Sequence, residues 1–415
     1  MLNLMLEKMP SLTSEQWAFL LDNKMDRQLV GQTSTVSYCV RCVQTNQRPR
    51  MVFNQDGVCS ACLYWDKKAT LPWKERELEL GHILDRHRSK DGAYDVIVPG
   101  SGGKDSAYVT HQLKTKWGMH PLTVTWSPFA YTEIGYANFQ SFIHSGFDNL
   151  LATPNGALHR KLTLLSTALV GDPFLPFIWG QISYAFHIAK SMNIPLVFFG
   201  ENGEAEYGGS VDTQESSSMP ISVWRDNYFK GVTPSRLLEV GIEIGLISPD
   251  EAKNVSRFYF PPNFADFDNT LRPLENYWYG YFTEWKPQEN FFYASENTGF
   301  RANPEGRTQG TYSKYASIDD RVDGFHYYFG LLKFGVGRAT SDAAHEIREG
   351  LIDRSEAVEL VRQYELEFPS RNFDYFLDYS GLTPSQFEAL ADKFRSDHLW
   401  VKKGQEWELK FPVWN

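Results

Sequence analysis

Short apolar runs separated by stretches of helical spacing dominate the first half of the chain. Strand-like runs lie at 94–98, 122–126, 149–152 and 195–199. Helices are expected at 73–90, 104–117, 158–169 and 182–189. Gly118 and Gly171 follow two of these helices and act as stop signals. Strands that alternate with helices predict an α/β fold with a parallel, doubly wound sheet.

The segments on either side of this pattern differ from it. Residues 1–37 form a polar lead-in with one short helix expected at 12–22. Ser248-Pro-Asp-Glu251 and Thr383-Pro-Ser-Gln386 are capping boxes with proline at the first helical position, so the C-terminal region should be mainly helical. We therefore divide the chain into a lead-in (1–37), a cysteine module (38–72), an α/β domain (73–215) and a C-terminal substrate-binding region (216–415).

Composition and charge narrow the class of protein. The chain has 415 residues, of which 42% are hydrophobic and 22% charged, so it can form a substantial core. Its net charge of -10 argues against a nucleic-acid partner, which requires a basic face. No run reaches the ~18 apolar residues of a membrane span, and the N-terminus has no clear signal peptide. We expect a cytoplasmic protein without a membrane partner.

All four cysteines lie in one short segment, as Cys39-Val-Arg-Cys42 and Cys59-Ser-Ala-Cys62. Two such pairs separated by 16 residues fit a tetrahedral zinc site, and four thiolates leave no open position. The site should be structural, in a zinc ribbon with a short strand at 51–53. Reduced thiols or disulfides are the alternative. If zinc takes all four cysteines, no thiol remains for nucleophilic chemistry.

A phosphate-binding loop is expected directly after the first strand, in Gly100-Ser-Gly-Gly-Lys-Asp-Ser106. Glycines allow backbone N–H groups to surround an anion, and the following helix adds its N-terminal dipole. The candidate phosphate ligands are Gly100, Ser101, Gly102, Gly103, Lys104 and Ser106. Asp105 could hold Mg²⁺. Asp105 in place of Ser or Thr after the lysine excludes a Walker A loop, and an ordinary Gly-Ser turn is the structural alternative.

A second glycine- and acid-rich stretch follows the strand at 195–199, as Gly200-Glu-Asn-Gly-Glu-Ala-Glu-Tyr-Gly-Gly209. It should reach the same edge of the sheet as the phosphate loop. Gly200, Glu201, Glu204 and Glu206 are candidates for cofactor binding, Mg²⁺ binding or acceptor positioning. A solvated acidic loop is the alternative.

These motifs resemble known families. Ser101-Gly-Gly-Lys-Asp-Ser106 resembles the PP-loop of N-type ATP pyrophosphatases, and the 200–209 stretch is similar to an acidic segment of asparagine synthetases. The cysteine module ahead of both motifs resembles the N-acetyl sugar amidotransferase family of bacterial surface-polysaccharide and pseudaminic-acid-type pathways. Ser313-Lys-Tyr315, Asp319 and Phe334-Gly-Val-Gly-Arg-Ala-Thr-Ser-Asp342 agree with this resemblance, which spans about 38–365.

The resemblance implies an adenine-nucleotide α-hydrolase-like sheet and an ATP-dependent reaction. An acetamido oxygen of a nucleotide-linked sugar is adenylated, and ammonia then displaces AMP to give an acetamidino group. Lys104 would balance developing charge, and Asp105, with Glu201 as a second candidate, would place Mg²⁺. Lys314 and Arg338 are further candidates for contacting phosphate or sugar.

The chain carries no glutaminase signature, and no histidine lies in a triad by spacing. The family resemblance implies ammonia from a separate glutaminase subunit with a synthase-like barrel partner. Asp172 and Arg160, near expected helix ends, are lesser candidates. The alternative hypotheses for the function are a PP-loop tRNA thiolase, a carboxylate amide ligase and a non-catalytic binding module.

Overall fold

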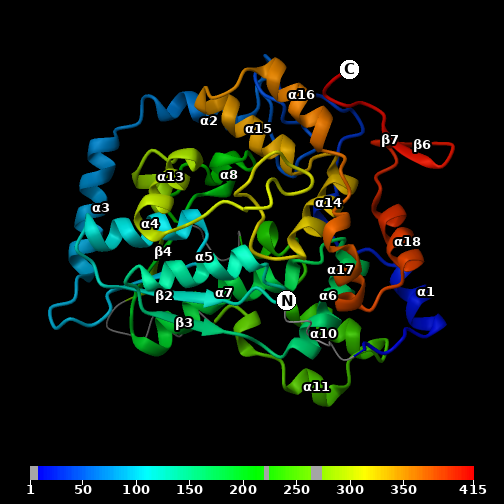
Figure 1. Cartoon of the computed structure of the whole chain (residues 1–415), viewed down its shortest axis with the longest axis horizontal. Helices are drawn as coiled ribbons and strands as arrows, with labels where there is room; N and C mark the ends of the chain where they lie inside the picture. The colour runs from blue at the N-terminus through cyan, green and yellow to red at the C-terminus, as the bar shows by residue number, and fades with distance from the viewer. Residues whose placement is uncertain (1–7, 219–223, 263–272) are drawn as a thin grey trace.

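A five-stranded parallel sheet lies at the centre of the protein (Figure 1). The computed structural model describes residues 8–218, 224–262 and 273–415. The strands are β1 (Val96–Pro99), β2 (Pro121–Trp126), β3 (Asn149–Ala152), β4 (Leu196–Phe199) and β5 (Glu275–Trp278). Their order is β3-β2-β1-β4-β5, and every neighbouring pair is parallel. The predicted α/β class with a parallel sheet is confirmed.

Helices cover both faces of the sheet. They are α3 (Trp73–His87), α4 (Lys104–Thr115), α5 (Glu133–His144), α6 (Gly156–Val170) and α7 (Leu175–Met192). Ile97 of β1 belongs to the same apolar cluster as α6 and α7, whereas its neighbours Val96 and Val98 pack with α3 and α4. Side chains alternate across a strand, so nearly every position of β1 is buried on one face or the other. This two-sided burial explains the continuous apolar runs in the sequence.

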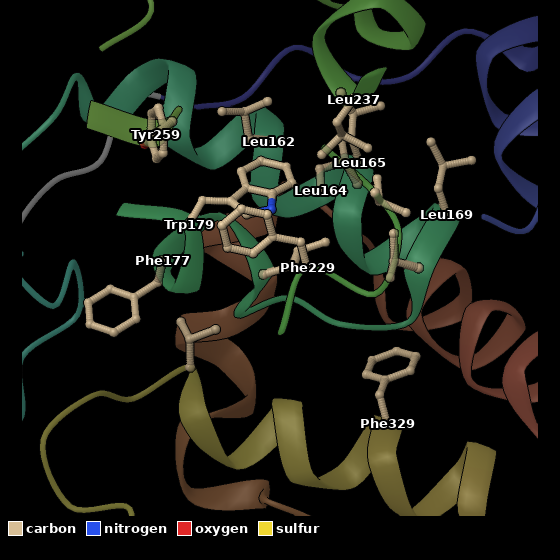
Figure 2. Close-up of a cluster of buried hydrophobic side chains, with 14 of the residues drawn as sticks. Leu162, Leu164, Leu165, Leu169, Phe177, Trp179, Phe229, Leu237, Tyr259 and Phe329 are labelled. Atoms are coloured by element: carbon tan, nitrogen blue, oxygen red, sulfur yellow. The ribbon is translucent and has the colours of Figure 1, made fainter. Parts of the chain in front are cut away.

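The largest apolar cluster joins distant parts of the chain (Figure 2). Leucines along α6 meet Trp179 of α7, and Phe329 comes to the same cluster from α14 (Asp323–Phe334). Leu20 of α1 (Ser14–Asp22) is fully buried in it. The lead-in and the C-terminal region therefore share one core with the sheet.

The C-terminal region is mainly helical, as predicted. Its helices are α10 (Pro234–Glu243), α11 (Pro249–Lys253), α12 (Tyr279–Phe282), α13 (Pro287–Thr298), α14, α15 (Arg338–Glu349), α16 (Arg354–Tyr364), α17 (Phe373–Ser380) and α18 (Pro384–Phe394). Capping boxes begin α11 and α18 at Ser248 and Thr383. An antiparallel hairpin of β6 (Trp400–Lys403) and β7 (Glu406–Leu409) follows α18.

The structure differs from the sequence prediction in two places. β5 pairs with β4, so the sheet extends beyond the boundary drawn at residue 215. The expected zinc ribbon is also wrong in form. Phe53 makes one isolated bridge to Cys59 rather than part of a strand, and α2 (Ser60–Lys68) begins at the second cysteine pair. A second isolated bridge joins Tyr38 to Thr45, so the module holds two bridges and a helix in place of the expected strand.

Within the described residues, no single helix has the length and apolar composition of a membrane span. The pair α6 and α7 passes that test only together and is bent by 117° between its members. Most residues of both helices are buried in the protein.

Candidate active site

The strand order places a crevice at the carboxyl ends of β1 and β4. On one side of β1 the sheet continues with β2 and then β3. On its other side it continues with β4 and then β5, so the strand order reverses between β1 and β4. Open α/β sheets bind ligands at such a reversal of strand order. The 100–106 loop follows β1 and α8 (Gly203–Glu206) follows β4, so both predicted motifs meet here. A Cβ added at Gly200 would lie 3.8 Å from the Cβ of Asp105.

The 100–106 loop has a backbone that its glycines make possible. Gly102 has φ +88°, and a Cβ there would meet the Cα of Phe139 in α5 at 2.6 Å. Gly103, the N-cap of α4, has an ordinary φ of -67° and provides no side-chain cap. A Cβ at Gly103 would meet nothing within 4 Å. The start of α4 therefore has no side-chain cap and has open space beside Gly103, as an anion site requires.

Charged and polar side chains surround this loop. Lys104 Nζ lies 2.5 Å from Asp105 Oδ2, and Asn290 donates to Asp105 Oδ1 at 3.3 Å. The hydroxyl of Ser101 donates to Asp319 Oδ2 at 3.2 Å. Ser106 donates to the carbonyl of Gly103 at 3.0 Å, a local helix-start bond. The site thus offers one lysine, backbone donors and two flanking carboxylates.

Two cavities open on the loop. A small cavity of about 230 Å³ is lined by Ser101, Gly102, Gly103, Lys104, Asp105, Asn138, Glu201, Tyr315, Asp319 and Arg338, among others. A large cavity of about 670 Å³ shares Ser101, Gly103, Asp105 and Glu201 with it. Aromatic side chains of Trp126, Phe174, Phe177, Phe199, Trp224 and Trp278 line the large cavity. Its volume is in the range of nucleotide and cofactor sites.

Two carboxyl groups at the small cavity hold their protons unusually firmly. Burial and the nearby Asp105 carboxylate raise the pKa of Glu201 to about 7, although Lys104 opposes the shift. Burial and Asp323 raise the pKa of Asp319 to about 6. Carboxylates that repel one another beside a phosphate loop fit the oxygen ligands that Mg²⁺ takes together with substrate phosphates. Asp105 and Glu201 are therefore suited to hold Mg²⁺.

Arg338 is the most favourably placed of the remaining predicted residues. It begins α15, and its guanidinium donates to the Tyr327 hydroxyl at 2.5 Å and pairs with Asp342 at 3.1 Å. It lines the small cavity together with Lys104, although the two come from segments more than 200 residues apart. Its placement agrees with the predicted phosphate contact.

Three predicted acidic or basic residues do not reach either cavity. Lys314 is exposed and lies outside both linings. Glu206 forms a buried ion pair with Lys68 of α2 at 2.5 Å. Glu204 accepts from Arg50 at 2.5 and 3.1 Å. The two glutamates link the 200–209 stretch to the cysteine module, so their contacts are structural.

Arg160 and Asp172, the lesser candidates, have different surroundings. Arg160 is buried and donates to the carbonyls of Asp378 and Tyr379, which ties α6 to α17. Asp172 is fully buried and pairs with Lys230 and His326. Both partners line the large cavity, yet neither was identified from the sequence. No spacing signal could have found them, because the three residues lie 58 and 154 positions apart.

The four cysteines lie together, as the predicted metal site requires. Their sulfur atoms lie within 4.8 Å of one another, and all four residues are buried. The Cys39–Cys62 and Cys42–Cys59 sulfur distances are 4.0 and 3.7 Å. A tetrahedral zinc ion with Zn–S bonds of about 2.3 Å has sulfur–sulfur edges of about 3.8 Å. The donor set therefore fits zinc, with no open ligand position.

The cysteine module also forms part of the cavity wall. Arg48 Nε donates to the carbonyl of Gly208 at 2.9 Å, and Arg50 holds Glu204. Arg48, Pro49 and Arg50 line the large cavity. Among groups of three or more potential ligands in the described parts of the chain, only these cysteines lie close enough to share an ion. The metal centre thus supports the site from outside rather than taking part in it.

The fold and site define a parallel α/β protein with a candidate anion-binding loop at the switch point of its sheet. Residues 309–411 match the family described as "LPS biosynthesis protein WbpG-like, C-terminal domain". The chain therefore carries a WbpG-like domain in its C-terminal part.

Two further comparisons add little. No curated protein matches the chain. Among solved structures, NMN synthetase from Francisella tularensis is 14% identical over 48% of this chain and 83% of that one, with a TM-score of 0.25. A likeness at this level carries no argument about fold or function.

Proposed function

We propose that the chain is an ATP-dependent amidotransferase of bacterial surface-polysaccharide synthesis. It would convert an acetamido group of a nucleotide-linked sugar into an acetamidino group and release AMP and pyrophosphate. The observation that carries this proposal is that the 100–106 loop and the WbpG-like segment line the same cavity. Asp323, His326 and Tyr327 come from that segment, and Ser101 and Asp105 come from the loop.

The first half-reaction requires an activated amide. An amide oxygen is a poor leaving group, so it attacks the α-phosphorus of ATP and pyrophosphate departs. The open N–H groups at Gly103 and the start of α4 would bind phosphate oxygens, and Lys104 would balance the charge that develops on pyrophosphate. Arg338, which lines the same small cavity as Lys104, would contact the same phosphates. Mg²⁺ held by Asp105 and Glu201 would neutralise further phosphate charge.

The second half-reaction replaces the adenylated oxygen by nitrogen. Ammonia attacks the imidate carbon, the carbon–oxygen bond breaks and AMP leaves. The aromatic walls of the large cavity would exclude water, which would otherwise return the imidate to the starting amide. If zinc takes all four cysteines of the chain, none is available to release ammonia from glutamine. A separate glutaminase with its barrel partner in the cytoplasm is the proposed source.

Acceptor-dependent release of pyrophosphate tests the adenylation step. Purified protein would be assayed with ATP, Mg²⁺, ammonium and a panel of nucleotide-linked diacetamido sugars, beside Lys104→Ala and the control Lys116→Ala. Lys116 lies at the other end of α4 and forms an exposed ion pair with Glu77. We expect Lys104→Ala to lower turnover at least about 100-fold, as loss of a transition-state charge contact does. Equal turnover in all three proteins would refute the loop assignment.

A further inference from the structure

A buried carboxylate orients a histidine at the wall of the large cavity. Asp172 follows α6 and is fully buried, and its Oδ1 lies 2.8 Å from Nδ1 of His326 on α14. Its Oδ2 pairs with Lys230, which follows the π-turn at Trp224–Tyr228. A carboxylate that accepts from Nδ1–H fixes the imidazole tautomer and leaves Nε2 as the proton acceptor. The geometry is therefore that of a carboxylate–histidine pair.

The backbone around this pair supports a precise arrangement. Lys230 adopts φ +54°, which is unusual for a residue with a side chain. Phe174 N–H donates to Asp172 Oδ1 at 2.9 Å, so the carboxylate is fixed from its own segment as well. Burial alone would raise the pKa of Asp172, but His326, Lys230 and Lys333 hold it well below its usual range. Asp172 thus stays ionised beside the histidine.

His326 shares its cavity with the 100–106 loop. Both line the 670 Å³ space, together with Phe174 and Trp126. Asp323, one helical turn before His326 on α14, also lines it and acts electrostatically on Asp319 beside Ser101. A molecule that reaches from the loop along α14 would therefore pass the imidazole.

We propose that His326, oriented by Asp172, is the group that accepts the proton released when ammonia attacks the adenylated acceptor. This inference rests on the proposed function and names a catalytic residue and its positioning residue within it. Neither belongs to the loop motifs, and the pair comes from two helix ends far apart in sequence.

The proton and electron balance of the step is complete. The lone pair of ammonia forms the new carbon–nitrogen bond while the π pair of the imidate C=N bond moves to its nitrogen, and the attached NH₃⁺ group loses one proton to Nε2 of His326. The pair on nitrogen then re-forms the C=N bond as the carbon–oxygen bond breaks, and the electron pair of that bond leaves on the phosphate oxygen of AMP. The product is the amidine, and the imidazolium returns its proton to solvent. No oxidant, reductant or further co-reactant is needed.

Several charged groups face the pair from the elements packed around it. Asp172 and Lys230 contact it directly, and Asp323 lies on the same helix. Lys333, further along α14, forms a buried ion pair with Asp26 at 2.6 Å. The two lysines offset the two buried aspartates, Asp172 and Asp26, and Asp323 adds one further carboxylate on the helix that carries the imidazole.

Separating the two half-reactions tests the proposal. Adenylation is measured as acceptor-dependent exchange of labelled pyrophosphate into ATP without ammonium, and amidine formation by mass spectrometry with ammonium. His326→Gln should keep the exchange within about threefold of wild type and lower kcat for amidine formation about 100- to 10,000-fold at pH 7, the range of general base catalysis. Imidazole added to His326→Ala should restore part of the rate in proportion to its free-base concentration.

Asp172→Asn and His187→Gln complete the design. Asp172→Asn should slow amidine formation and leave the pyrophosphate exchange unchanged. If Asp172→Asn fails to fold, His326→Gln still tests the proposal. His187 on α7 bonds the carbonyl of Phe260 outside the cavity, so its variant should match wild type in both assays.

The inference would be overturned by parallel loss of both half-reactions in His326→Gln, by a raised KM for the sugar with unchanged kcat, or by failure of imidazole to rescue His326→Ala. If wild type formed no amidine from ammonium, the proposed function would fall together with the inference. An active His326→Gln beside an active wild type would refute the inference alone.

Discussion

Replacing Gly102 by alanine tests the geometry of the 100–106 loop. An L-residue at φ +88° costs about 1–2 kcal/mol, and the new methyl group would overlap the backbone of α5. Its three closest contacts, at 2.6, 2.8 and 2.9 Å, are backbone atoms of Phe139 and Asn138, which cannot rotate away. Overpacking of this kind adds about 1–3 kcal/mol. We expect Gly102→Ala to lower the free energy of unfolding by about 2–5 kcal/mol.

Gly103→Ala provides the matched comparison. Its φ of -67° suits alanine, and the added Cβ would meet no protein atom within 4 Å. Its stability should therefore stay within about 0.5 kcal/mol of wild type. The methyl group would enter the space assigned to phosphate, however, and the loss of one charged hydrogen bond would weaken ATP binding about 10- to 100-fold. Gly156→Ala, at another open position, should change neither property.

Urea unfolding and calorimetric titration with ATP and Mg²⁺ measure both effects on the same samples. The reasoning requires Gly102→Ala to lose stability and affinity, and Gly103→Ala to lose affinity alone. Wild-type affinity in Gly103→Ala would show that phosphate does not occupy the loop. Wild-type stability in Gly102→Ala would refute the steric argument.

Three further predictions concern the surroundings of the site. Lys68→Met should lower the free energy of unfolding by about 3–5 kcal/mol in urea titrations, because it leaves the buried Glu206 with His345 as its remaining partner. Lys68→Met combined with Glu206→Met should recover most of this loss, and an unchanged midpoint in the single variant would contradict the prediction. Elemental analysis should find one zinc per chain. Cys59→Ser should lose both the metal and ATP affinity, because the cysteine module supports the wall of the large cavity. Full ATP affinity in the metal-free variant would refute this supporting role. The pKa of Asp319 in the folded protein is about 6, above its ordinary value of 3.8. The wild type should therefore lose stability relative to Asp319→Asn as pH rises from 4 to 7. A difference in unfolding free energy that stays constant over this range would contradict the prediction.

The sheet was predictable where local sequence determines structure. β1 to β4 are short apolar runs, and the loop after β1 is a contiguous motif. β5 was missed because its residues, Glu-Asn-Tyr-Trp, show neither alternation nor a continuous apolar run. It also joins the sheet 76 positions beyond the end of β4, in an aromatic-rich region. Its placement depends on pairing with β4, which only the folded chain shows.

The candidate site was predictable in the same partial way. Lys104, Asp105 and Glu201 lie in motifs that follow strands, and they meet at the cavity as expected. Glu206 has the residue type of a metal ligand, but its role is decided by Lys68 on a helix 138 positions earlier. Asp172 and His326 likewise acquire their relation only through packing of α14 against the end of α6. Long-range ion pairs cannot be predicted from the spacing of residues in the sequence, because they depend on the tertiary fold.

The most direct test of the account is the mass of the sugar product formed with ¹⁵N-labelled ammonium. Wild-type protein, ATP, Mg²⁺ and the panel of nucleotide-linked diacetamido sugars would be combined, with the partner glutaminase and glutamine in a parallel reaction. The account predicts one sugar in which oxygen is exchanged for a labelled NH group, formed in equal amount to AMP and pyrophosphate. AMP and pyrophosphate released without label in any sugar would contradict it.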